Sequence, residues 1–183
     1  GGGVTGTGLT LTSTVVPSGS GVITANNASN DFTGTLSVNS RGSLIRDTNG
    51  LTLVLNDLAN STITTGGLLT VSGNVSNNFV VNVAGPISFG AMSVGGFLDA
   101  TAAGNITQTG LLSVTGNLWA LTTTGNIDLG GYRNVNNVIT LTGFTNHLGG
   151  TVSLIAPTDP TPLANPAVAR GSDVSLKADS IRV

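Results

Sequence analysis

The chain has 183 residues, and about half of them are Gly, Thr, Asn or Ser (27, 27, 19 and 17 copies). Only six residues are basic and eight are acidic; all eight acids are Asp, and Lys177 is the single lysine. Because Glu, Lys, Arg, Gln and Met are good helix formers, their scarcity excludes helical bundles and coiled coils and disfavours α/β enzyme folds. A formal net charge of −2 without a basic run disfavours nucleic-acid binding, which needs Lys and Arg against phosphates.

The apolar content argues against disorder and against a membrane span. Val, Leu, Ile and Phe contribute 54 residues, or about 30% of the chain, whereas disordered chains usually fall below ~20%. These residues form short clusters, and none approaches the roughly 18 apolar residues of a membrane span. The lack of cysteine excludes a disulfide scaffold and a Cys-ligated zinc site. Because the chain starts at Gly1 without an initiator Met or a signal peptide, we expect it to be a piece of a longer protein.

In chain order, the sequence predicts a Gly-rich lead-in, a long series of short strands and a proline-rich loop. Residues 1–8 are either a flexible lead-in or a poorly patterned first coil. Residues 51–55, 80–83 and 139–142 alternate apolar with small polar residues, which is typical of strands with one buried face. Four of the six prolines lie in 157–166, so we expect an ejected loop over 157–170. The regular pattern resumes over 171–183 as a last coil.

Blocks of sequence return at a nearly constant interval. Residues 67–74 match 110–117 after 43 positions, close to two units of 21 or 22, and residues 97–101 match 118–122 after 21. Val138 follows Leu118 by 20, and residues 152–156 return as 174–178 after 22. The step Gly-Asn-apolar recurs at Gly73, Gly104, Gly116 and Gly125. Since Gly and Asn tolerate the backbone conformations of corners, these steps predict a corner that recurs in every repeat.

These observations predict an all-β fold, a parallel β-helix (β-solenoid) that occupies residues 1–183 as a single segment. Each coil would hold about 21 residues in three short strands, and roughly eight coils would form a rod of about 40 Å. Hairpin-built sandwiches do not explain why whole blocks return at such a regular interval. We also expect Asn side chains at the Gly-Asn corners to hydrogen-bond from coil to coil as ladders.

The degenerate repeats resemble those of the filamentous haemagglutinin family of two-partner-secreted or autotransporter-like bacterial exoproteins. The resemblance spans about residues 34–183 and rests on texture and period, in runs such as 103–107, 112–118 and 173–178. It implies a right-handed parallel β-helix, passage through an outer-membrane secretion barrel, and adhesion or filament building at the bacterial cell surface. The family's secretion domain carries Asn-Pro motifs followed by Gly or by Asn-Leu. The single Asn-Pro here, Asn165-Pro166, is followed by Ala167, so the resemblance is to the repeat shaft alone.

The sequence predicts no catalytic, cofactor-binding or metal-binding residue. A sugar-cleaving β-helix needs clustered carboxylates, as acid and base or as calcium ligands. Only Asp159 and Asp179 come near one coil apart, and Asp159 lies in the proline-rich loop; the other six acids are Asp31, Asp47, Asp57, Asp99, Asp128 and Asp173. We therefore interpret the Asp residues as corner caps and exposed charges.

A few other side chains could serve as contacts. We expect His147, the sole histidine, to be a solvated corner residue, with Asp128 and Asp173 as the acids it could pair with. Trp119 should lie one coil above Leu98, as a core filler in preference to an exposed ring that stacks on a sugar. Tyr132 and Arg133 are candidates for exposed contacts. The Thr-x-Thr steps at 10–12, 62–64 and 140–142 are not one coil apart, which disfavours an ice-binding array.

The function predicted from sequence is a structural or adhesive shaft, without enzymatic activity or cofactor, at the surface of a bacterium. Its partners would be other copies or neighbouring repeats of the same chain, an outer-membrane secretion barrel, and a host-cell or glycan receptor, with no nucleic acid. The alternative is a β-helix that binds or cleaves carbohydrate, as in a tailspike or a polysaccharide lyase. An aligned groove of Asp, Arg and aromatic residues would distinguish it.

Overall fold

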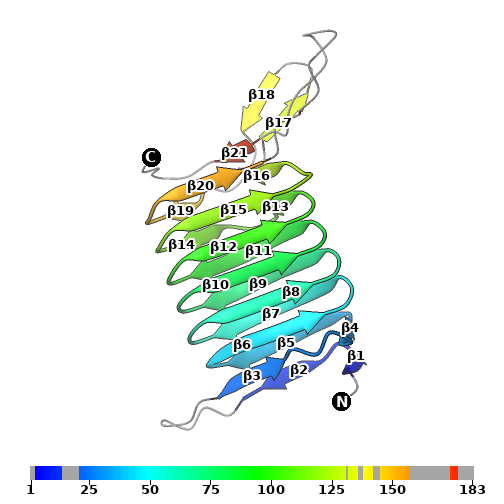
Figure 1. Ribbon diagram of the computed structural model, residues 1–183. Helices are drawn as coiled ribbons and strands as arrows, with labels where there is room; N and C mark the ends of the chain where they lie inside the picture. Colours follow the sequence, from blue (N-terminus) through cyan, green and yellow to red (C-terminus); the bar gives the residue numbers. More distant parts are fainter. Residues whose placement is uncertain are drawn as a thin grey trace.

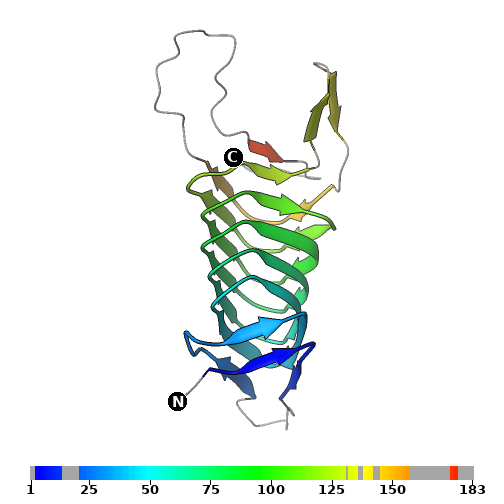
Figure 2. The same cartoon turned by 90° about the vertical axis from the view of Figure 1, so that its right-hand side faces the viewer.

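The computed structural model describes residues 3–13, 21–130, 132–135, 138–141, 145–156 and 174–176. Every regular element in these ranges is a β-strand, and the strands stack in parallel as a β-solenoid of about six turns with about 19 residues per turn. Figures 1 and 2 show the coils lying one on another along a rod. The predicted all-β solenoid is confirmed. The described residues include no helix long and apolar enough to cross a membrane.

Two parallel sheets form the long sides of the rod. The seven-stranded sheet contains β3 (Val22–Ala25), β6 (Gly42–Asp47), β8 (Ser61–Thr65), β10 (Phe79–Val83), β12 (Leu98–Ala102), β15 (Leu118–Thr122) and β20 (Val152–Ile155). The ten-stranded sheet contains β2 (Thr10–Thr12), β5 (Thr35–Ser40), β7 (Leu51–Asp57), β9 (Leu69–Val75), β11 (Ile87–Val94), β13 (Ile106–Gln108), β14 (Leu112–Val114), β16 (Ile127–Leu129), β19 (His147–Leu148) and β21 (Val174–Leu176). Two smaller sheets pair β1 (Thr5–Thr7) with β4 (Asp31–Thr33), and β17 (Tyr132–Val135) with β18 (Val138–Leu141).

The core is a continuous apolar column between the two sheets. Strand β7 shows the expected alternation, since every second residue from Leu51 to Asp57 is buried. In the seven-stranded sheet the register stacks one buried residue per coil, all fully buried: Ile45, Ile63, Val81, Ala100 and Ala120. Each coil therefore buries its inward face against its own opposite side and against the coils above and below.

The backbone hydrogen bonds continue from the strands into the corners. At the corner that leads into the ten-stranded sheet, the N–H groups of Leu51, Leu69 and Ile87 donate to the carbonyls of Leu68, Pro86 and Asn105 of the next coil, over 2.8, 3.0 and 2.8 Å. Polar backbone groups at turns therefore find partners one coil away. This matters because an unpaired buried N–H or C=O is costly.

The sequence predicted a constant coil length, whereas the coils lengthen along the chain. Thr35 pairs with Thr52, Thr52 with Thr70, and Ile106 with Ile127, so the spacing of partners rises from 17 to 18 and then to 21. Two of the four added residues enter at one bend of the ten-stranded sheet, and the other two enter at the corners 57–61 and 122–127. Leu55 faces Gly73, one extra residue lies between Phe89 and Met92 in the next coil, and one more separates β13 from β14. The period of 21 therefore holds only for the last part of the series.

The lengthening also changes the number of strands per coil. Three short strands, as predicted, occur only towards the two ends of the rod, for example β4, β5 and β6. Between Leu51 and Ala102 each coil has two strands, one in each long sheet, because the bend is absent or is absorbed within a single strand. The prediction of three strands in every coil was wrong for this middle part.

All four repeat alignments made from sequence were out of register, that of 97–101 with 118–122 by one residue, because Leu98 pairs with Leu118. Leu69 pairs with Ile87, which pairs with Ile106, whereas Leu112 pairs with Met92 above Gly73; the blocks at 67–74 and 110–117 thus do not stack. Leu118 pairs with Val152 rather than with Val138, whose strand β18 pairs antiparallel with β17. Strands β20 and β21 belong to different sheets, so 152–155 and 174–176 do not stack either.

The described residues include parts of the predicted lead-in and of the predicted last coil. The Gly-rich lead-in contributes a strand, because β1 pairs in parallel with β4. Gly8 and Gly34 both have positive φ (61° and 75°) and lie one above the other at the turn that follows each strand. Residues 157–170 lie outside the described part, and of the predicted last coil the structure describes 174–176, which pair with β16.

Replacing Gly73 with Ala should destabilise the rod by at least about 3 kcal/mol. Gly73 has φ of 116°, and a Cβ there would lie 2.0 Å from the carbonyl oxygen of Leu55 in the coil below. Gly8→Ala is the matched control, because its φ is also positive but its Cβ would meet nothing within 4 Å. It should cost about 1 kcal/mol. Urea unfolding followed by circular dichroism measures the free energy of unfolding of both variants. Equal losses in the two variants would contradict the close stacking of Gly73 on Leu55.

Candidate functional site

The described carboxylates are dispersed along the rod. Asp47 and Asp57 are buried, whereas Asp31, Asp99 and Asp128 are partly exposed on different strands. No group of three His, Cys, Asp or Glu side chains that could hold a metal ion occurs among the described residues. Asp159, Asp173 and Asp179 lie outside the described part. Asp57 is not one of the expected exposed charges, because it is fully buried.

Asp57 is a fully buried carboxyl group held by three serine hydroxyls. The hydroxyl of Ser40, one coil below, donates to Oδ1 over 2.6 Å, and those of Ser43 and Ser61 donate to Oδ2 over 2.5 and 2.6 Å. These serines come from β5, β6 and β8, so the group joins three strands at the corner between the long sheets. A buried carboxyl group is tolerated when it is hydrogen-bonded in this way. Nothing in the alternation pattern distinguished this Asp from an exposed one.

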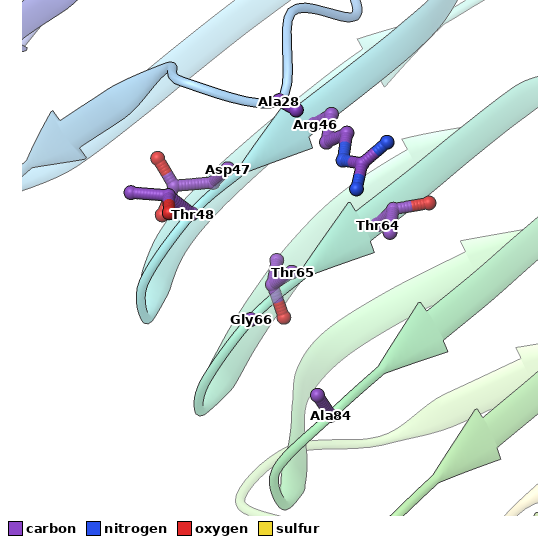
Figure 3. Close-up of a pocket in the computed structure, with 8 residues that line it drawn as sticks. All are labelled: Ala28, Arg46, Asp47, Thr48, Thr64, Thr65, Gly66 and Ala84. Atoms are coloured by element: carbon purple, nitrogen blue, oxygen red, sulfur yellow. The ribbon is translucent and has the colours of Figure 1, made fainter.

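The corner that follows β6 forms a shallow cavity of about 230 Å³ (Figure 3). Its lining comes from successive coils and consists of Ala28, Arg46, Asp47, Thr48, Thr64, Thr65, Gly66 and Ala84. The carboxylate of Asp47 accepts the backbone N–H groups of Phe32 and Asn49, over 2.7 and 3.0 Å, and serves as a corner cap. Arg46 supplies the one charge on the outer side, next to Thr64. The cavity therefore has no second acid or base with which Asp47 could perform proton transfer.

Hydrogen bonds of the Asn146 side chain close the coil that is interrupted by a long insertion. The spacing of partners rises from 21 between β13 and β16 to 34 between β14 and β19. The buried Asn146 side chain donates to the Leu129 carbonyl (2.7 Å) and to Gln108 Oε1 (2.9 Å), and its oxygen accepts the Leu112 N–H (3.1 Å). Asn146 thus ties the two sides of the interruption to the coil below. The inserted segment includes the hairpin β17–β18, drawn beyond the stacked coils in Figure 1.

The remaining sequence candidates are placed as follows. His147 is exposed, as expected, although it lies in strand β19 beside Ser113 rather than at a corner. Asp128 pairs with Thr107 in a separate column of the ten-stranded sheet. Tyr132 and Arg133 lie in β17, whose backbone pairs with β18.

The predicted place of Trp119 was wrong by one residue. Leu118, not Trp119, pairs with Leu98, and Trp119 pairs with Asp99. Because side chains alternate between the faces of a strand, a slip of one position moves each residue to the opposite face. Leu118 is therefore buried, and Trp119 is 51% exposed on the outer face of the seven-stranded sheet.

Asparagine side chains link successive coils, but they do so mainly by accepting hydrogen bonds from backbone N–H groups. The side-chain oxygens of Asn105 and Asn117 accept the N–H groups of Asn126 and Thr151 one coil above, over 2.9 and 3.0 Å. An amide-to-amide bond of the predicted type joins Asn56 to Asn39 over 3.2 Å, away from the Gly-Asn steps. Gly73 lies within β9 rather than at a turn, unlike Gly104, Gly116 and Gly125.

The Thr-x-Thr steps do not line up, as expected, because β2, β8 and β18 belong to three different sheets. Single threonines do align, however. Thr35, Thr52 and Thr70 form one outward column on the ten-stranded sheet, which continues through Ser88 and Thr107. This column consists of small uncharged polar side chains up to Thr107, where Asp128 follows.

Residues 76–155 match a family described as "Repeats of unknown function (DUF5649)". The match runs from the corner before β10 to the last residue of β20, so it includes both the regular coils and the interrupted one. Neither the curated proteins nor the solved structures gave a match. Repeats of this kind therefore fold here as a β-solenoid, and the resemblance to filamentous haemagglutinin stays a prediction.

Asp57→Ala should lower the free energy of unfolding by about 3 kcal/mol, because three buried hydroxyls would lose their shared acceptor. Asp99→Ala, which removes a carboxylate without a hydrogen-bond partner among the described residues, should change it by less than about 0.5 kcal/mol. Urea titrations of both variants against the parent chain make the comparison. Similar small effects in both would show that the serine cluster does not hold the corner.

Proposed function

We propose that this chain is a non-enzymatic shaft, part of a secreted bacterial surface protein that presents or assembles adhesive surface. The observation that carries the proposal is the unbroken series of parallel pairings from β3 to β20, with a continuous apolar core inside it. A solenoid of this kind is a natural spacer, because each coil adds a fixed rise of about 4.8 Å along the axis.

The composition of the outer faces suits such a spacer. Small uncharged polar residues predominate on the outer face of the ten-stranded sheet between β5 and β13, and the buried polar groups at the corners serve to hold neighbouring coils together. Asp47 and Asp57 are engaged in such hydrogen bonds, which favours a structural over a polysaccharide-cleaving function.

Secretion through an outer-membrane barrel is part of the same proposal and is supported by the family resemblance. A chain without cysteine can pass a narrow pore unfolded. Since every contact in a solenoid is with an adjacent coil, it can then fold coil by coil on the far side. The proposed location is outside the bacterial cell, with a host-cell or glycan receptor as the partner of the assembled protein.

We further propose that the shaft lengthens by parallel pairing with another copy or with neighbouring repeats. Strands β3 and β20 are the outermost strands of the seven-stranded sheet among the described residues. Their inward residues Ile23, Ala25, Val152 and Leu154 pack against the core but are only partly buried. Pairing β20 of one copy with β3 of the next would bury them, and such a head-to-tail contact generates an open filament.

Electron microscopy and light scattering at rising protein concentration test this proposal, with filaments as the expected result. Ile23→Lys should abolish assembly, because it places an inward-pointing charge on the edge strand. Thr24→Lys, on the outer face of the same strand, should leave assembly intact. Circular dichroism checks that both variants keep the fold. Particles of the parent chain that stay monomeric throughout would argue against self-association.

A further inference from the structure

Trp119 lies on the outer face of a sheet and is about half exposed to water. It is the only tryptophan of the chain, it projects from the outer side of β15, and it is 51% exposed. Indole rings usually contribute their large apolar area to a core or to a contact. Since the column of buried residues passes through Leu118 and Ala120 on either side of it, Trp119 contributes little to the core of the rod.

The register places hydrogen-bonding groups on both sides of the ring. Asp99 lies next to Trp119 one coil below and Ser153 one coil above, at the spacing of about 4.8 Å between strands. The carboxylate of Asp99 is partly exposed and makes no hydrogen bond or ion pair with the described residues. Figure 1 shows the three strands that carry these residues, β12, β15 and β20, side by side.

A second column completes the surface. Thr101, Leu121 and Ile155 follow one another on the same face, one per coil, and Ile155 is 44% exposed. We call the five residues Asp99, Thr101, Trp119, Leu121 and Ile155 the tryptophan patch. It is polar towards β12, and towards β20 the apolar Ile155 lies on the same face as Ser153.

We propose that the tryptophan patch binds a neutral glycan. A pyranose ring offers an apolar face of C–H groups that can lie on indole, and a rim of hydroxyls that can donate to the Asp99 carboxylate. The unpaired negative charge matches a ligand rich in donors and repels uronate, sulfate and phosphate groups. The site lies on the shaft but does not depend on self-association.

Other occupants match the patch less well. A stable protein–protein interface needs roughly 20–30 residues a side, whereas the apolar part of this patch consists of Trp119, Leu121 and Ile155. Recognition of a quaternary ammonium group uses a cage of several aromatic rings. Trp119 is the single aromatic residue of the patch.

Intrinsic fluorescence of the full chain tests the proposal directly, because all tryptophan emission comes from the site. The probes are neutral oligosaccharides of glucose, mannose, galactose and N-acetylglucosamine, with polygalacturonate and choline as comparators. We expect a saturable blue shift with at least one neutral series and none with either comparator. No response to any neutral series, or a preference for polygalacturonate or choline, would overturn the proposal.

Calorimetry on variants places the site. With the best neutral probe, Trp119→Ala should weaken binding at least about tenfold, Trp119→Tyr should retain most of it, and Asp99→Asn should weaken it. Thr62→Ala, outward in the Asp99 column two coils below, should leave it unchanged. Equal affinity of the parent and of the folded Trp119→Ala or Asp99→Asn chain would show that the sugar binds elsewhere. Loss of binding in Thr62→Ala would also show that the sugar binds outside the tryptophan patch.

Discussion

The parallel register between successive coils is the constraint on which the rest of this structure depends. Once Ile45 stacks on Ile63 and Ile63 on Val81, the alternation of the strands decides which residues enter the core and which face water. Because the side-chain period of a strand is two, a shift of one residue would expose the whole column. The turns, the buried polar groups and the exposed Trp119 all follow from that register.

The buried polar side chains lie where the backbone hydrogen bonds between successive coils are irregular. Asn30 joins the first coils, since its side chain accepts the Val4 N–H and donates to the carbonyls of Ala25 and Arg46. Asp57 holds the corner where the three-strand coil gives way to the two-strand coil, and Asn146 closes the coil interrupted by the hairpin. Each supplies hydrogen bonds where the backbone ladder is irregular, which explains why these polar residues are buried.

The sequence predicted the fold class well and the register poorly. The alternation in 51–55 and 80–83 identified real strands, because a half-buried strand needs that pattern wherever it lies. The same alternation in 139–142 belongs to an antiparallel hairpin, since periodicity does not specify the pairing partner. The longer coils near the end of the series set the apparent period, and the resulting slip placed Trp119 in the core. Asp57 and Asn146 could not be found, because their partners are distant in sequence.

Engineered disulfides measure the register most directly, because the natural chain has no cysteine and adjacent parallel strands bring paired Cα atoms within bonding range. Thr62 faces Val80, and Thr101 faces Leu121, one coil apart. The double variants T62C/V80C and T101C/L121C should cross-link readily on oxidation. T62C/V83C and T101C/T122C, which follow the constant period predicted from the sequence, should stay reduced. Efficient cross-linking of the second set and not of the first would contradict a stack of lengthening coils.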